Sequence, residues 1–225
     1  MKKLFVLMSM LLWSIIEINA QQVVDQGQTG SSTTIRFYNM TENVYNVLEG
    51  SPYSSIEFQD GSILPFLPNS KWISGYKLRY NSYANQLEFK ELNVIKKVLP
   101  TDIKAFKIGE AIYESGFPAI DKLNNNSFYN VLFDGKAKLL KNSTTLLQEV
   151  KTADDVKQGD KFTTYDYYYL FENEEIKKFF TTKKAFLKVI PSAKIAAIET
   201  FINEKKLKLK DENDFVEVVK FYNSL

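Results

Sequence analysis

The spacing of apolar side chains changes once along this chain, near residue 182, and this change limits the possible folds more than any other feature. In residues 33–182, short apolar and aromatic segments alternate with polar residues at period two, as in β-strands. In residues 183–225, apolar residues recur every three or four positions, as on the buried side of an α-helix. This order predicts an α+β fold, an antiparallel β-meander of about 7–10 strands followed by three short C-terminal helices.

Two Asp-Gly dipeptides predict hairpin turns. Asp60-Gly61 and Asp134-Gly135 each stand between apolar segments. A two-residue hairpin turn requires positive φ, which glycine adopts without a steric cost. We therefore expect a tight turn at each dipeptide.

The most regular strand covers residues 162–171, with aromatic residues at every second position. A charged loop is expected before it, over residues 151–161, and a turn after it at Asn173-Glu174. Further strands are expected over residues 72–80, 86–92, 94–99, 103–108, 128–133, 136–140, 146–150 and 176–181.

Capping residues predict where the helices begin. Thr182 caps a short helix that Pro191 stops, Ser192 caps a second helix, and Asp211 caps a third. Apolar stripes follow the last two caps: Ile195, Ile198 and Ile202, then Phe215, Val218, Val219 and Tyr222. Because helices this short are marginal alone in water, they must pack on the sheet.

The N-terminal residues predict export. Lys2 and Lys3 precede an apolar segment, residues 4–16, and Ala20 stands at the expected cleavage position of a signal peptide. The apolar segment is shorter than the roughly 20 residues that span a bilayer. No later segment is long and apolar enough to span one. The expected location is the periplasm, the outer surface or the extracellular space.

The predicted organisation has three segments. Residues 1–20 are the signal peptide, and residues 21–32 are a polar, flexible leader. Residues 33–225 form one globular domain, with a β-rich region over 33–182 and a helical region over 183–225.

The composition excludes common catalytic chemistry. The chain has neither cysteine nor histidine. Serine–histidine and cysteine–histidine pairs are therefore impossible, and ordinary zinc sites are not expected. Lys and Arg number 29 against 27 Asp and Glu, a balance that gives no general attraction to nucleic acid. No residue is assigned to a catalytic, cofactor or metal site, and no cofactor is expected.

Carboxylates are the remaining catalytic candidates. A glycosidase would need two of them facing each other across a cleft. No spacing singles out a pair among Glu88, Glu91, Glu110, Glu114, Asp121, Asp134, Asp154, Asp155, Asp160 and Asp166. A calcium loop starting at Asp154 would need oxygen ligands where Val156, Gln158 and Tyr165 stand, so a solvated loop is expected instead.

Two segments are candidate binding surfaces. Residues 177–210 contain ten lysines and only two acids, Glu199 and Glu204, which would suit an anionic envelope component or an acidic protein. The alternative is that these lysines only solvate short helices. Tyr165, Tyr167, Tyr168 and Tyr169 could form an aromatic platform for a ligand, or could simply belong to a strand with one face in the core.

Several segments carry a loose resemblance to known sequences. LRYNSYANQLEF, NVLFDGKAKLL, AFLKVIP and IETFINEKKLKLKDENDFVEVVKFYNSL are similar to segments of uncharacterised secreted proteins of Bacteroidota-type bacteria. Such proteins have no assigned activity and no assigned catalytic residues, so the resemblance implies export and leaves the function open.

Together these features predict an exported, non-catalytic binding or structural protein of the bacterial envelope or exterior. One alternative is a carrier of an apolar ligand inside a curved sheet, and another is a carboxylate-dependent glycan hydrolase. A filled core would favour the binding protein, a closed apolar cavity the carrier, and a polar cleft with two facing carboxylates the hydrolase.

Overall fold

The computed structural model describes residues 21–22, 35, 37–39, 48–92 and 94–225. The predicted signal peptide lies outside the described residues. Of the predicted leader, only Gln21–Gln22 is described, and it forms a short strand, β1, that pairs with Phe37 and Tyr38.

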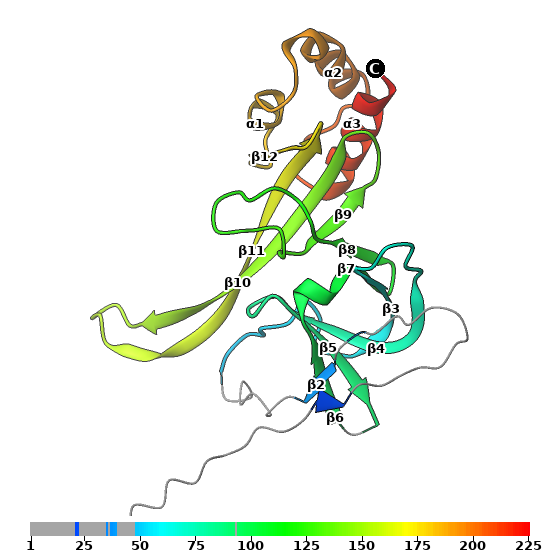
Figure 1. Ribbon diagram of the computed structural model, residues 1–225. Helices are drawn as coiled ribbons and strands as arrows, with labels where there is room; N and C mark the ends of the chain where they lie inside the picture. The colour runs from blue at the N-terminus through cyan, green and yellow to red at the C-terminus, as the bar shows by residue number, and fades with distance from the viewer. Residues whose placement is uncertain (1–20, 23–34, 36, 40–47, 93) are drawn as a thin grey trace, which may run out of the picture.

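One antiparallel sheet of 12 strands runs through the whole described chain, in the order β1-β2-β6-β5-β4-β3-β7-β8-β9-β10-β11-β12. Apart from the two very short N-terminal strands, ten strands remain, and three helices follow them, so the α+β prediction is confirmed at this level (Figure 1). The strands are β1 Gln21–Gln22, β2 Phe37–Asn39, β3 Gln59–Pro65, β4 Ile73–Asn81, β5 Gln86–Glu91, β6 Val94–Val98, β7 Ile103–Ile108, β8 Ala111–Glu114, β9 Tyr129–Phe133, β10 Lys138–Lys151, β11 Lys157–Glu172 and β12 Glu175–Phe179.

The first half of the sheet is curled. Strands β6 and β7 are joined by only four residues, 99–102, most of which form the 3-10 helix η1, Pro100–Asp102. In a flat sheet β6 and β7 would lie four strand spacings apart, roughly 19 Å, which is more than a short helical connection can span. The curled region, β3–β7, closes around its own buried cluster, which includes Ile63, Leu78, Leu87, Val98, Ile103 and Phe106.

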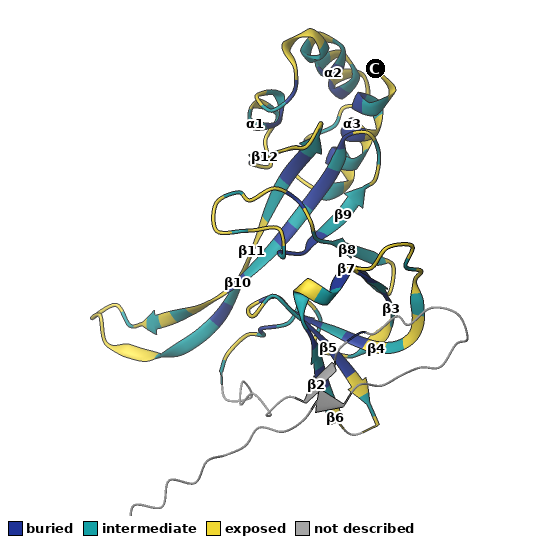
Figure 2. Cartoon of the chain, in the orientation of Figure 1, coloured by how far each residue is buried: buried dark blue, intermediate teal, exposed yellow. Residues whose placement is uncertain are grey.

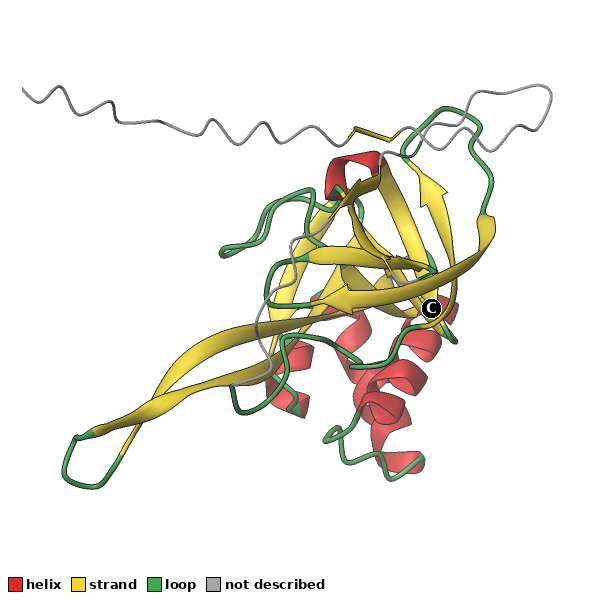
Figure 3. Cartoon of the chain, turned by 90° about the horizontal axis from the view of Figure 1, so that it is seen from below, coloured by secondary structure: helices red, strands yellow, loops and turns green. Residues whose placement is uncertain are grey.

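The second half of the sheet is built on the long hairpin β10–β11. Its register runs from Lys138 opposite Phe171 to Val150 opposite Gly159. Strand β9 lies beside residues 139–141 and β12 beside residues 168–172. The next part of the hairpin contacts the first half of the chain, because the N–H of Phe162 donates to the carbonyl of Glu49 at 2.9 Å and the hydroxyls of Thr145 and Ser82 share a hydrogen bond of 2.7 Å. The outer half, residues 144–165, projects from the molecule, and we call it the arm (Figures 1 and 3).

Three helices cover one face of the inner hairpin: α1 Lys183–Leu187, α2 Ser192–Glu204 and α3 Glu212–Ser224. As predicted, Thr182 caps α1 through the amide of Ala185, and Asp211 caps α3 through the amide of Asp214. Ser192 is not a cap, because α2 begins at Ser192 itself and Pro191 takes the cap position without a side-chain bond.

The predicted apolar stripes do face the core, and because of them the helical region is heavily buried where it meets the sheet (Figure 2). On α3 the whole stripe is buried, and on α2 two of the three isoleucines are. These residues form a second cluster with sheet residues: Ala137, Leu139, Leu170, Phe179, Phe186, Ile198, Ile202, Phe215, Val218, Val219 and Tyr222.

The prediction of a tight turn at Asp60-Gly61 is wrong. Both residues lie inside β3, where they pair with Lys77 and Tyr76 of β4. A Cβ atom on Gly61 would come within 2.3 Å of the backbone oxygen of Lys107. Glycine is needed here because a neighbouring strand comes too close for any side chain, and not because a turn needs positive φ.

The turn expected at Asp134-Gly135 is also corrected, although the hairpin it was meant to close exists. Leu139 pairs with Phe133, so the two strands are joined by a longer loop. Asn223 of α3 holds this loop by accepting from the backbone N–H of Ala137 (2.7 Å) and donating to its carbonyl (2.9 Å). A Cβ on Gly135 would lie 2.8 Å from Asn223 Oδ1, so this glycine makes room for the helix.

The charged loop expected over residues 151–161 is shorter than predicted, because β10 continues to Lys151 and β11 begins at Lys157. The turn expected at Asn173-Glu174 is confirmed. Glu172 pairs with Glu175, so only two residues form the turn, and both have positive φ, 52° and 64°.

Replacing Glu174 by glycine is expected to stabilise the protein by about 1 kcal/mol, because glycine accepts positive φ better than glutamate does. Chemical denaturation would measure the change. Glu175→Gly is the matched control, since residue 175 lies in β12, where glycine weakens the strand. A destabilised Glu174→Gly variant would contradict the turn geometry.

A candidate binding pocket at the base of the arm

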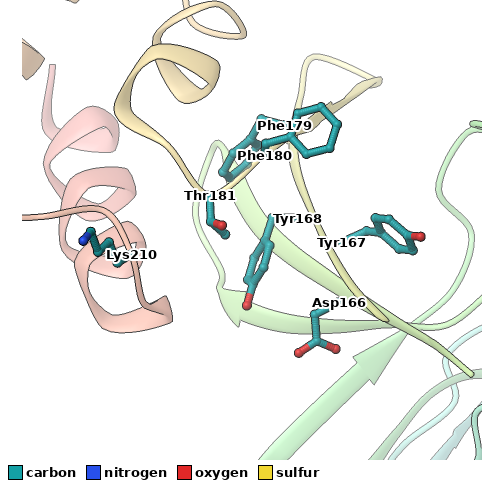
Figure 4. Close-up of a pocket in the computed structure, with 7 residues that line it drawn as sticks. All are labelled: Asp166, Tyr167, Tyr168, Phe179, Phe180, Thr181 and Lys210. Carbon is teal, nitrogen blue, oxygen red and sulfur yellow. The ribbon is translucent and has the colours of Figure 1, made fainter. Parts of the chain in front are cut away.

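A pocket of about 310 Å³ lies where the arm joins the helical region (Figure 4). Three segments of the chain form it: strand β11, the end of β12 with the connection to α1, and the connection between α2 and α3. The lining residues are Asp166, Tyr167, Tyr168, Phe179, Phe180, Thr181 and Lys210.

Tyr168 forms the floor, and a polar network fixes its position. Its hydroxyl donates to Glu212 Oε1 at 3.2 Å, and Lys141, directly across the sheet from Tyr168, forms an ion pair with the same oxygen. Burial and the nearby Glu212 carboxylate raise the pKa of the Tyr168 hydroxyl above its usual range. The hydroxyl therefore stays protonated at neutral pH, and it ties β11 to the first turn of α3.

Asp166 closes the pocket on the side of the arm. Its carboxylate accepts a hydrogen bond of 2.6 Å from the hydroxyl of Ser143, its cross-strand neighbour, and it is otherwise exposed. This arrangement holds one anionic group at the pocket edge.

The opposite rim combines an aromatic ring with a cation. Phe180 is 72% exposed, an unusually large exposure for a phenylalanine, while its neighbour Phe179 is buried in the core. Lys210 is exposed, and it forms no ion pair with any described residue. The rim can therefore offer apolar contact and positive charge to a ligand at the same time.

The two candidate segments from the sequence meet in this pocket. The tyrosine strand contributes Tyr168 and the lysine-rich segment contributes Lys210. Tyr167 points away from the cavity, to the opposite face of the sheet (Figure 4), where Lys178 lies 4.0 Å from its ring centroid. The sequence did not reveal Phe180 or Thr181, because exposure cannot be read from an apolar residue at a strand end.

The tyrosine strand is not a continuous platform. Tyr169 is buried in a third cluster, which Phe117 and Tyr129 also join. Tyr165, on the arm, is the most exposed of the four tyrosines, with 38% of its surface exposed, and its hydroxyl accepts a hydrogen bond from the side chain of Gln148. The structure thus splits the four tyrosines between core, pocket and arm.

The lysine-rich segment is only partly neutralised. Lys177, Lys178 and Lys183 form ion pairs with Glu175, Asp121 and Glu199, and Lys194 lies over the ring of Tyr222. The other six lysines are exposed and form no ion pair with described residues: Lys184, Lys188, Lys205, Lys206, Lys208 and Lys210.

Most of the ten candidate carboxylates form ion pairs with lysine or arginine side chains. Seven form ion pairs: Glu88, Glu91, Glu114, Asp121, Asp134, Asp155 and Asp160. Asp166 is the one member of the set that lines the pocket. Among the described residues, no group of three or more carboxylates is placed to hold a metal ion.

The comparisons with known proteins give no relative: no family model, no curated protein and no solved structure matches the chain. None of the helices in the described stretches of the chain is long and apolar enough to cross a membrane.

Proposed function

We propose that this protein is an exported, non-catalytic binding protein of the bacterial envelope or exterior, and that it binds an anionic group of its partner at the base of the arm. The observation that carries the proposal is the rim of the pocket, where the exposed Phe180 and the exposed Lys210, which forms no ion pair with a described residue, line one cavity. An aromatic anchor beside a free cation suits a ligand with an apolar body and a negative group.

The two alternatives have less support. A glycan hydrolase needs a second carboxylate facing the first, and Glu212, the carboxylate nearest the pocket floor, is bound to both Lys141 and Tyr168. A carrier needs an enclosed apolar cavity. A smaller pocket of about 90 Å³ is lined partly by charged residues, including Glu172 and Lys177.

The proposal predicts that Phe180→Ala combined with Lys210→Gln weakens partner capture roughly tenfold, because both the apolar contact and the charge are lost. The protein would be immobilised and used to capture binding partners from a native cell envelope, with quantification of the captured material. Capture by the parent should also fall as salt rises, since salt screens the charge attraction.

The matched control is Phe66→Ala combined with Lys71→Gln. This pair also removes one exposed phenylalanine and one exposed lysine, but from the curled region of the sheet. Equal capture by both double variants would contradict the pocket as the binding site. If Tyr165→Ala then abolished capture, the site would lie on the arm.

A further inference from the structure

The tip of the arm, residues 149–160, is acidic. It holds the carboxylates of Glu149, Asp154, Asp155 and Asp160, against two lysines, Lys151 and Lys157. The ion pairs within the tip are exposed and contribute little individually, and Asp154 forms none with a described residue.

The arm also exposes apolar side chains on both faces. Leu146 and Leu147 are 44% and 41% exposed and point to opposite faces, and Val156 at the tip is 61% exposed. Beyond Thr145 and Phe162, which are buried, the arm is a two-stranded hairpin with no third described strand beside it, and such a hairpin with exposed apolar residues is only marginally stable in water. A surface that covers the arm would therefore stabilise it.

The complementary surface lies at the far end of the same molecule. Six exposed lysines without described ion pairs surround α1 and the connection between α2 and α3: Lys184, Lys188, Lys205, Lys206, Lys208 and Lys210. In two perpendicular views the arm tip points away from the helices (Figures 1 and 3). Opposite charges that cannot meet within one chain can meet between two chains.

We infer that the arm of a second copy of this chain binds to the surface formed by these six lysines, and that two copies form a closed, two-fold symmetric dimer. In such a pair each arm reaches the helical region of the other copy, so the contact between the acidic tip and the lysines forms twice. The twelve tip residues and the exposed residues of α1 and the α2–α3 connection approach the roughly 20–30 residues per partner of a stable interface.

This inference goes beyond the proposed function and does not rest on it. The pair uses the tip of the arm and the six lysines, whereas the proposed partner site depends on Phe180 and Lys210. Because the two surfaces share Lys210, the variants that test the pair leave Lys210 and Phe180 unchanged, so that failure of one proposal is separable from failure of the other.

The test is the mass of the purified protein by sedimentation equilibrium at low and high salt, roughly 0.05 and 0.5 M NaCl. We expect a dimer at low salt whose dissociation constant rises at least tenfold at high salt. A parent protein that is monomeric at both salt concentrations overturns the inference, and so does a mass that grows beyond two copies.

Charge reversal then tests the two surfaces. Glu149→Lys with Asp154→Lys makes the tip basic. Replacing four of the six lysines by glutamate, at Lys184, Lys188, Lys206 and Lys208, makes the helical surface acidic. Each of these two variants alone should be monomeric, and a mixture of the two should dimerise again, because every contact then joins opposite charges. All six side chains are exposed, and circular dichroism would verify that each variant is folded. Dimers of either variant alone, or no dimer in the mixture, overturn the inference.

Discussion

Replacing Arg79 with methionine is expected to lower the free energy of unfolding by about 3–5 kcal/mol, because it leaves a buried carboxylate without its counter-charge. Glu88, directly opposite Arg79 on β5, is completely buried. The Arg79 guanidinium donates to Glu88 Oε2 from Nε at 3.1 Å and from Nη2 at 2.5 Å.

Arg79 also holds an adjoining segment against the sheet. Its guanidinium lies 3.7 Å from the ring centroid of Tyr53 and 4.3 Å from that of Phe58, and it donates to the carbonyl of Ile56 at 3.2 Å. Stacking of this kind stabilises by about 0.5–2 kcal/mol at a partly desolvated site. Loss of Arg79 therefore weakens both the ion pair and the attachment of this segment.

Urea denaturation of the parent and the variants would measure the change. The matched control is Lys77→Met on the same strand, whose ion pair with Asp60 is largely exposed, so we expect a loss below about 1 kcal/mol. Adding Glu88→Leu to Arg79→Met should recover much of the loss, since an apolar pair can replace a buried ion pair. Equal effects of Arg79→Met and Lys77→Met would show that Glu88 does not depend on Arg79.

The helical region could be predicted from the sequence because its signals are local. A cap at Asp211 and a stripe of four apolar residues determine both where α3 begins and which side it buries, and the structure confirms both. Most of the strands were also predicted from their period, although β8 was missed and residues 146–150, expected as a separate strand, belong to β10. The turns at the two Asp-Gly dipeptides failed because contacts distant in sequence decide those glycines: Lys107 beside Gly61, and Asn223 beside Gly135.

The pocket could not be predicted, because it depends on which strands become neighbours. Lys141 and Tyr168 face each other only through the β10–β11 register, and Glu212 reaches them only because α3 packs on that face. The sequence shows ten similar carboxylates and gives no reason to prefer Glu88, which alone of these is fully buried. Burial and cross-strand pairing, and not residue type, separate the structural carboxylates from the exposed ones.

Phe215→Ala in α3 is expected to cost about 3–5 kcal/mol, because a fully buried ring is removed and the cavity left behind can close only partially. Phe215 is 0% exposed, and its ring centroid lies 5.3 Å from that of Phe179, 5.9 Å from that of Phe186 and 6.2 Å from that of Tyr168. The ring therefore connects α3 with α1, β11 and β12 at a single point.

The same contacts make α3 integral to the fold, so deletion of residues 211–225 should destabilise the protein more than Phe215→Ala does, or cause it to aggregate. Glu217→Ala is the matched control on the same helix, because Glu217 is exposed and its loss should change stability by less than about 0.5 kcal/mol. Thermal and urea denaturation would compare the three proteins with the parent. A truncated chain that unfolds at the same urea concentration as the parent would mean that α3 is an appendage. The buried ring of Phe215 argues against this outcome, since without α3 the apolar surfaces of Phe179 and Phe186 would face water.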